Sequence, residues 1–70
     1  MQLQVHDVAR WVNAVTGSET NGERFVQDEI DGTSLLLLNC QQLQGELGLK
    51  LGPAVKLNNA LMRLKGVMGV

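Results

Sequence analysis

The chain has 70 residues, a formal net charge of −1, one tryptophan and one phenylalanine, and 44% of its residues are hydrophobic. A domain of this length buries only about 60% of the surface of its unfolded chain, which leaves little room for an internal catalytic cavity. A single cysteine excludes an internal disulfide bond and, together with the lack of a signal-peptide pattern, predicts an intracellular protein.

The first half of the chain predicts two helices separated by a loop. Valines recur at spacings of three and four in residues 5–16, which predicts an amphipathic helix. Residues 16–22 are rich in turn formers and predict a loop. A short helix over 23–29 would then bury Phe25 and Val26.

Four consecutive leucines, residues 35–38, follow Gly32 and precede Asn39. The leucine segment is too short to span a membrane, and periodicity alone does not choose between a buried helical turn and a short strand. Asn39 is a good N-cap and predicts a further short helix. That helix is expected to end at Gly48, where a left-handed residue is tolerated.

The last predicted element is the longest helix. It is expected to begin at Gly52 and Pro53, because proline at the first helical position loses no needed N–H donor and presets the backbone angle. Apolar residues then recur at spacings of three and four from Ala54 to Met68, with the helix ending near Gly66. The sequence contains no internal repeat, low-complexity tract or linker, so it predicts one structural unit.

Two segments carry a family resemblance. Residues 30–38 read IDGTSLLLL and residues 47–56 read LGLKLGPAVK. Their combination resembles a SAM (sterile alpha motif) domain, most of all the SAM domains of polyhomeotic, sex-comb-on-midleg and MBT-repeat chromatin proteins of the Polycomb group. The resemblance implies an all-α fold, a five-helix bundle with a long C-terminal helix, forming a single domain over 1–70 with a core of about 3–66.

The first residues depart from the family pattern, although Trp11 matches an aromatic position that many SAM domains keep. SAM domains commonly begin with a tryptophan followed by serine or threonine, whereas this sequence has Leu3 and Gln4. Glutamine is a poor N-cap and leucine fills less volume than tryptophan, so we expect fraying of the first helix and lower stability.

Charge is distributed unevenly along the chain. Residues 1–35 contain six acids and two arginines, a net charge of −4, whereas residues 36–70 contain one acid and four bases, a net charge of +3. Two oppositely charged surfaces on one small body favour head-to-tail association. Contacts of this kind produce open filaments unless the rotation closes a ring.

The resemblance implies that the domain binds another SAM domain, either its own copy or a different one, through an end-helix surface and a mid-loop surface. By motif, the end-helix surface comprises Lys50, Leu51, Gly52, Pro53, Ala54 and Lys56. The mid-loop surface comprises Asp28, Glu29, Asp31, Thr33 and Ser34, with part of the leucine segment behind them. In this arrangement Leu51 is an apolar plug, and the flanking lysines face carboxylates of the neighbour.

Simpler interpretations of these residues stay open. Leu51 is equally compatible with a core position beneath the last helix. The acids are compatible with a solvated face, and Thr33 and Ser34 with local helix caps.

Catalysis and metal binding are not expected. His6 and Cys40 lie on different segments, so neither a zinc site with the usual ligand spacing nor a Cys–His pair can be assembled. His6 is expected at the surface of the first helical turn. We therefore expect no enzyme activity, cofactor, metal, small-molecule substrate or membrane partner.

Two alternative functions are a SAM domain that binds an RNA stem-loop and a monomeric docking module of a signalling scaffold. RNA binding would use Lys50, Lys56, Arg63 and Lys65. Four cations without a nearby aromatic side chain, in a chain of net charge −1, are weak evidence for a nucleic-acid-binding surface. The preferred interpretation is a non-catalytic protein–protein interaction module of a nuclear transcriptional or chromatin regulator, where the nuclear location follows from the resemblance.

Overall fold

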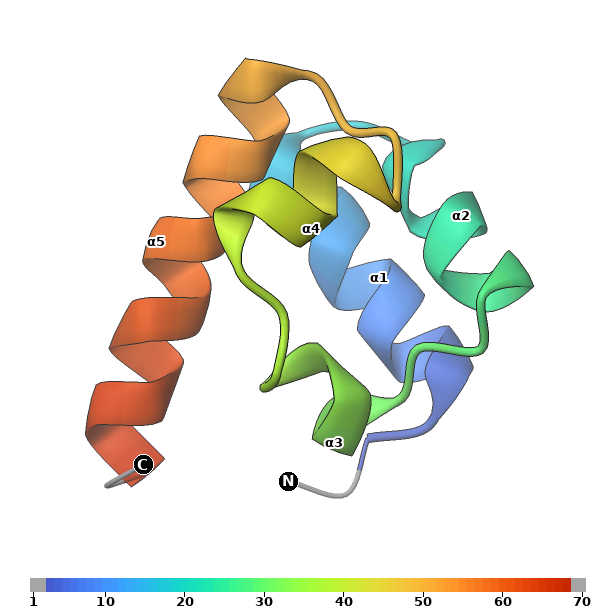
Figure 1. Ribbon diagram of the computed structural model, residues 1–70. Helices are drawn as coiled ribbons and strands as arrows, with labels where there is room; N and C mark the ends of the chain where they lie inside the picture. Colours follow the sequence, from blue (N-terminus) through green and yellow to red (C-terminus); the bar gives the residue numbers. More distant parts are fainter. Residues whose placement is uncertain (1–2, 69–70) are drawn as a thin grey trace.

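The computed structural model describes residues 3–68, so residues 1, 2, 69 and 70 of the predicted domain lie outside it. Within this range the chain forms five helices and no strand, as the resemblance to SAM domains implies. They are α1 (Val5–Thr16), α2 (Asn21–Gln27), α3 (Gly32–Leu35), α4 (Cys40–Gly45) and α5 (Leu51–Met68). Helix α5 runs along one side of the molecule, α1 and α2 pack together, and α3 and α4 complete the bundle (Figure 1).

Helix α1 has the predicted boundaries, and Val8 and Val12 are completely buried on its inner face. Its start is better capped than Gln4 alone suggested. The Gln4 backbone N–H donates a hydrogen bond to Asp7 Oδ2 at 3.2 Å, so a carboxylate in the first helical turn satisfies a backbone donor there.

Helix α2 begins at Asn21, two residues before the predicted start, so the predicted loop is wrong at its last two residues. Gly22 lies where α2 meets α1, and its N–H donates to Asn13 Oδ1 at 2.7 Å. A Cβ atom on Gly22 would lie 2.4 Å from the carbonyl oxygen of Ala9. This glycine therefore serves a close helix–helix contact and not a turn. Phe25 is fully buried, as predicted.

The start of the leucine segment is helical, because α3 ends at Leu35 and Leu36 continues in the right-handed helical region; the strand alternative is wrong. The four leucines differ sharply in environment. Leu35 is fully buried, whereas Leu37 is 79% exposed. The run is therefore only partly a core element.

Helix α4 is capped by Asn39 as predicted: Asn39 Oδ1 accepts from the Gln42 N–H at 2.9 Å, and Gln42 Oε1 accepts from the Asn39 N–H at 3.1 Å. The predicted end at Gly48 is wrong, because α4 ends at Gly45. Gly48 nevertheless adopts the expected left-handed conformation, with φ of 70°, in the connection to α5.

Helix α5 begins at Leu51, so Pro53 occupies the third helical position and not the first. The N–H of the third residue also has no intrahelical acceptor, so proline loses nothing there. The helix continues to Met68, beyond the end predicted near Gly66.

The core is mostly aliphatic and gathers residues from every helix. Its buried members are Val8, Val12, Phe25, Leu35, Leu43, Leu47, Leu49, Ala54, Leu57 and Leu61. None of the helices within residues 3–68 combines the length and the hydrophobicity that crossing a membrane requires.

Candidate interaction surfaces

The end-helix surface is centred on Leu51, the first residue of α5. Its side chain is 64% exposed, so the alternative that placed it in the core is wrong. Lys50, Gly52 and Lys56 are exposed around it. An apolar side chain with two cationic neighbours thus projects from one end of the molecule.

Two members of the predicted end-helix surface are less exposed than Leu51. Ala54 is completely buried and packs in the core, so its side chain is out of reach of a partner. Pro53 is half-buried. Val55, which sequence reasoning missed, is 42% exposed one helical turn after Leu51 and extends the apolar surface. The signal was available in the sequence, because Val55 follows Leu51 by four positions, a spacing that puts both on one helix face.

The mid-loop surface begins where α2 ends. Asp28 and Glu29 are both exposed, and Glu29 has a left-handed φ of 56° that turns the chain toward α3. Arg24 Nε donates to Asp28 Oδ2 at 3.2 Å, and another nitrogen of Arg24 donates to the Glu46 carbonyl oxygen at 3.1 Å. The charge of Asp28 is therefore partly balanced within the chain, whereas no such contact involves Glu29 among residues 3–68.

Asp31 has a structural role of its own. It is the N-cap of α3, and its Oδ1 accepts a hydrogen bond from the Ser34 N–H at 2.9 Å. Hydrogen bonds from the Ser34 backbone and side chain, and then from the Thr33 backbone, lower the pKa of Asp31 below its ordinary value of 3.8. The cap is thus the aspartate and not Thr33 or Ser34, and Thr33 is left exposed.

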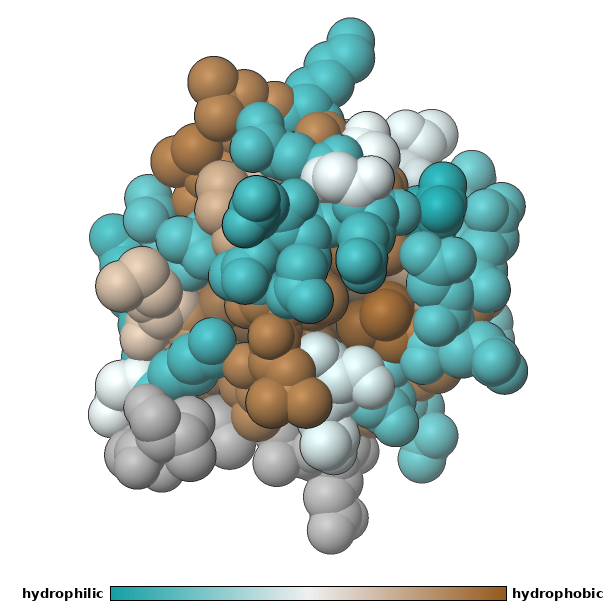
Figure 2. Space-filling view, viewed as in Figure 1, coloured by the Kyte–Doolittle hydropathy of each residue, from teal (hydrophilic) through white to brown (hydrophobic). Residues whose placement is uncertain are grey.

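The two surfaces lie at different ends of a body that measures 29 × 22 × 20 Å. In Figure 1 the start of α5 is at the top, and the α2–α3 connection is at the lower right. Figure 2 shows hydrophobic residues gathered at the upper left, over the first part of α5, and hydrophilic residues over the side formed by α2. The structure therefore keeps the apolar and basic end apart from the acidic segment.

The residues considered for other chemistry do not converge on a site. His6 is exposed on α1, as predicted, and Cys40 is half-buried at the start of α4. Among residues 3–68, no three His, Cys, Asp or Glu side chains are grouped so that they could hold a metal ion. Both aromatic side chains face inward, with Phe25 buried and Trp11 packed against the core, so neither offers a free platform for a stacked base.

Comparisons with known proteins agree with this architecture, although no family model matches the chain. The chain is 38% identical over 63 residues to the Polyhomeotic-proximal chromatin protein of Drosophila melanogaster. The matched region covers 90% of this chain and 4% of that protein. The chain is 41% identical over 61 residues to Polyhomeotic-like protein 2 of Xenopus laevis, covering 87% and 18% respectively. The chain thus spans only a small part of the length of these curated relatives.

Solved structures give the same result. The polyhomeotic SAM domain structure has a TM-score of 0.82 and 35% sequence identity, over 90% of each chain. A chain of the hetero SAM domain structure of Ph and Scm has a TM-score of 0.78 and 33% identity, over 90% of this chain and 96% of that one. The five-helix architecture is that of a small helical protein-interaction domain. The chain belongs to the SAM domain family, with polyhomeotic among its relatives.

Proposed function

We propose that this domain is a non-catalytic module that binds other SAM domains head to tail, with the end-helix surface of one domain on the mid-loop surface of the next. The observation that carries the proposal is the 64% exposure of Leu51 between exposed lysines. An apolar centre with a charged rim is the usual organisation of a protein interface. A large side chain at such a centre contributes far more binding energy than the charges around it.

The acidic segment supplies a complementary surface on the neighbour. Asp28 and Glu29 are exposed, and Val26 and Ile30 beside them are half-buried, so the segment offers both carboxylates and some apolar area. Complementary charge increases the association rate and fixes the orientation of the partners more than it raises affinity. Because the two surfaces differ and lie apart, each bound domain leaves one surface free, and the contact extends into a filament.

The similar structures support a SAM domain as the partner. One contains the SAM domains of Ph and Scm, and another is a heterodimer of the Scm and Sfmbt SAM domains. The relatives at 36–38% identity include the Polyhomeotic-proximal chromatin protein and Lethal(3)malignant brain tumor-like protein 1. We therefore also propose that this domain serves a chromatin or transcriptional regulator in the nucleus.

The test is a complementation experiment read by light scattering. The unaltered domain should gain mass with concentration, whereas Leu51→Arg and the double variant Asp28→Lys/Glu29→Lys should each lose this growth by losing one surface. Mixing the two variants should restore one contact and give a species of twice the monomer mass. If the unaltered domain stays monomeric, the same variants are titrated with the polyhomeotic SAM domain. A failure to bind it contradicts the proposal.

A further inference from the structure

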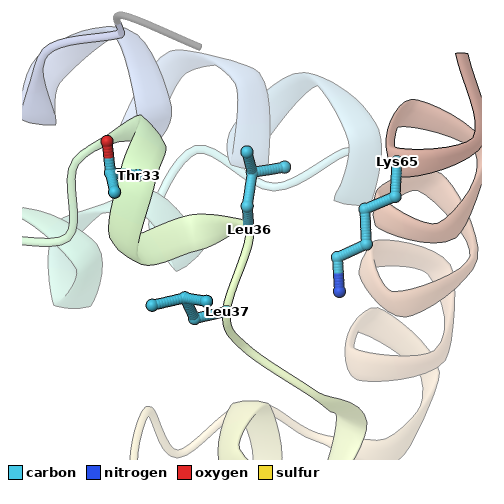
Figure 3. Close-up of a pocket in the computed structure, with 4 residues that line it drawn as sticks. All are labelled: Thr33, Leu36, Leu37 and Lys65. Atoms are coloured by element: carbon cyan, nitrogen blue, oxygen red, sulfur yellow. The ribbon is translucent and has the colours of Figure 1, made fainter. Parts of the chain in front are cut away.

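A separate hollow lies between α3 and the second half of α5. It has a volume of about 390 Å³, is open to solvent, and is lined by Thr33, Leu36, Leu37 and Lys65 (Figure 3). Leu37 is 79% exposed, which is more than the 64% exposure of Leu51 at the end-helix surface. The chain therefore leaves a leucine at the edge of a concave surface without covering it.

The lining combines apolar side chains with one positive charge. Leu36 and Leu37 provide the apolar part, and Lys65 extends from α5 on the side that faces them (Figure 3). No acid contributes to the lining. Within residues 3–68 the ion pairs are Arg10–Asp7 and Arg24–Asp28, so no described carboxylate balances Lys65. The hollow therefore favours a ligand that is apolar and negatively charged.

This chemistry does not fit the end-helix surface of another copy. Leu51 follows Lys50 directly and precedes Lys56 by five positions on α5, and these cations would approach Lys65. Like charges brought together at a contact are costly, so the hollow discriminates against that plug. The acids of the mid-loop surface belong to the α2–α3 connection. The hollow shares with that surface Thr33 and the leucine segment behind it, but none of its acids.

We propose that the hollow docks a short segment of another protein in which an apolar side chain lies next to a carboxylate. The apolar side chain contacts Leu36 and Leu37, and the carboxylate pairs with Lys65. A peptide fits better than an acyl chain, because an open hollow with four lining residues cannot enclose most of a long ligand. This proposal does not depend on head-to-tail association, since the hollow contains neither Leu51 nor the acids of the mid-loop surface.

The test uses the 70-residue chain with Leu51→Arg, which removes the proposed self-association, and follows backbone amide shifts by NMR. Three blocked peptides are titrated: acetyl-Gly-Glu-Leu-Leu-Glu-Gly-amide, the same peptide with lysines for glutamates, and the same peptide with serines for leucines. The first should bind at least fivefold more tightly than either of the others. Its largest shifts should fall on Thr33, Leu36, Leu37 and Lys65.

Matched variants decide whether Lys65 is the specific partner. Lys65→Glu should weaken the acidic peptide at least tenfold and improve binding of the lysine peptide. Arg63→Glu reverses a charge on the same helix, outside both the hollow and the end-helix surface, and should alter affinity less than twofold. Equal binding of all three peptides overturns the proposal, as does a shift pattern centred on Lys56 or Arg63. Because these readouts use a Leu51→Arg background, they fail or succeed independently of the head-to-tail contact.

Discussion

The end-helix and mid-loop surfaces differ in how far their residues also hold the fold together. At the end-helix surface, Leu51 projects into solvent and is not part of the core. At the mid-loop surface, Asp31 caps α3 and Asp28 pairs with Arg24. Substitution of Leu51 should therefore report on association alone, whereas substitution of Asp28 or Asp31 changes folding and association together.

The largest expected effect is the loss of binding in Leu51→Arg. Replacing a central apolar plug by a charge that must be desolvated should cost about 2 kcal/mol or more, which is roughly 30-fold in Kd. The melting temperature should stay unchanged because the side chain is exposed. Sedimentation of the variant and thermal unfolding measure both quantities. The control is Met62→Arg, since Met62 is 62% exposed on the same helix but lies outside the end-helix surface. Equal losses in both variants would show that the contact is not centred on Leu51.

A glycine pair tests whether the buried α1–α2 contact and the exposed start of α5 tolerate an added side chain differently. Gly22→Ala places a Cβ against the Ala9 carbonyl oxygen and should cost about 1–3 kcal/mol of unfolding free energy. Gly52→Ala meets no atom within 4 Å in the first turn of α5 and should stabilise the fold by about 0.4–1 kcal/mol. Urea unfolding measures both changes. Similar destabilisation by the two substitutions would contradict the close α1–α2 contact.

A smaller effect on folding is expected at Asp31, and it depends on pH. Hydrogen bonds lower the pKa of Asp31 in the folded state, so its stabilising contribution is present above its ordinary pKa of 3.8. That contribution is lost as pH falls through the lower, folded-state pKa. Asp31→Ala should therefore lower the melting temperature at pH 7, and the difference from the unaltered domain should shrink in strongly acidic solution.

Asp31→Asn separates the cap from the charge. Asparagine is also a good N-cap, so this variant should keep more of the stability than Asp31→Ala does. Thermal unfolding at several pH values distinguishes the three proteins. A difference between Asp31→Ala and the unaltered domain that does not depend on pH would show that the charge of the cap contributes nothing.

The smallest expected effect is that of Glu29→Lys. Glu29 already has a left-handed φ of 56°, which lysine tolerates no worse, so stability should change little. Reversing a rim charge should weaken association by about 0.2–1 kcal/mol, and the difference should fade at high salt. Binding measured at low and high ionic strength provides the check. A loss that does not respond to salt would place Glu29 at the centre of the contact.

Local patterns in the sequence were sufficient where the structure depends on neighbouring residues. The valine spacing predicted α1 at its observed boundaries, and Asn39 predicted the cap of α4. Both features depend on residues within three or four positions of each other, so a single sequence contains them. The IDGTSLLLL and LGLKLGPAVK segments were sufficient to predict the SAM family.

Contacts between distant residues caused the errors in the predicted elements. The turn-forming residues around Gly22 predicted a loop, but its place in α2 is set by the approach of Ala9 and Asn13 on α1. The exposure of Leu51 was undecided because one apolar residue between lysine and glycine fits a core position as well as a plug. Ala54 was assigned to the surface by motif, although packing of α5 buries it completely.

The sequence by itself therefore determined the family, the helical class, most helix positions and the uneven charge, because these follow from residue type and short spacing. Only the tertiary structure decided which leucines are buried. Leu35 and Leu37 are chemically identical and two residues apart, yet one is fully buried and the other is 79% exposed. The difference arises because a helical turn directs the two side chains to different faces, and only the packing of the other helices determines which face is covered.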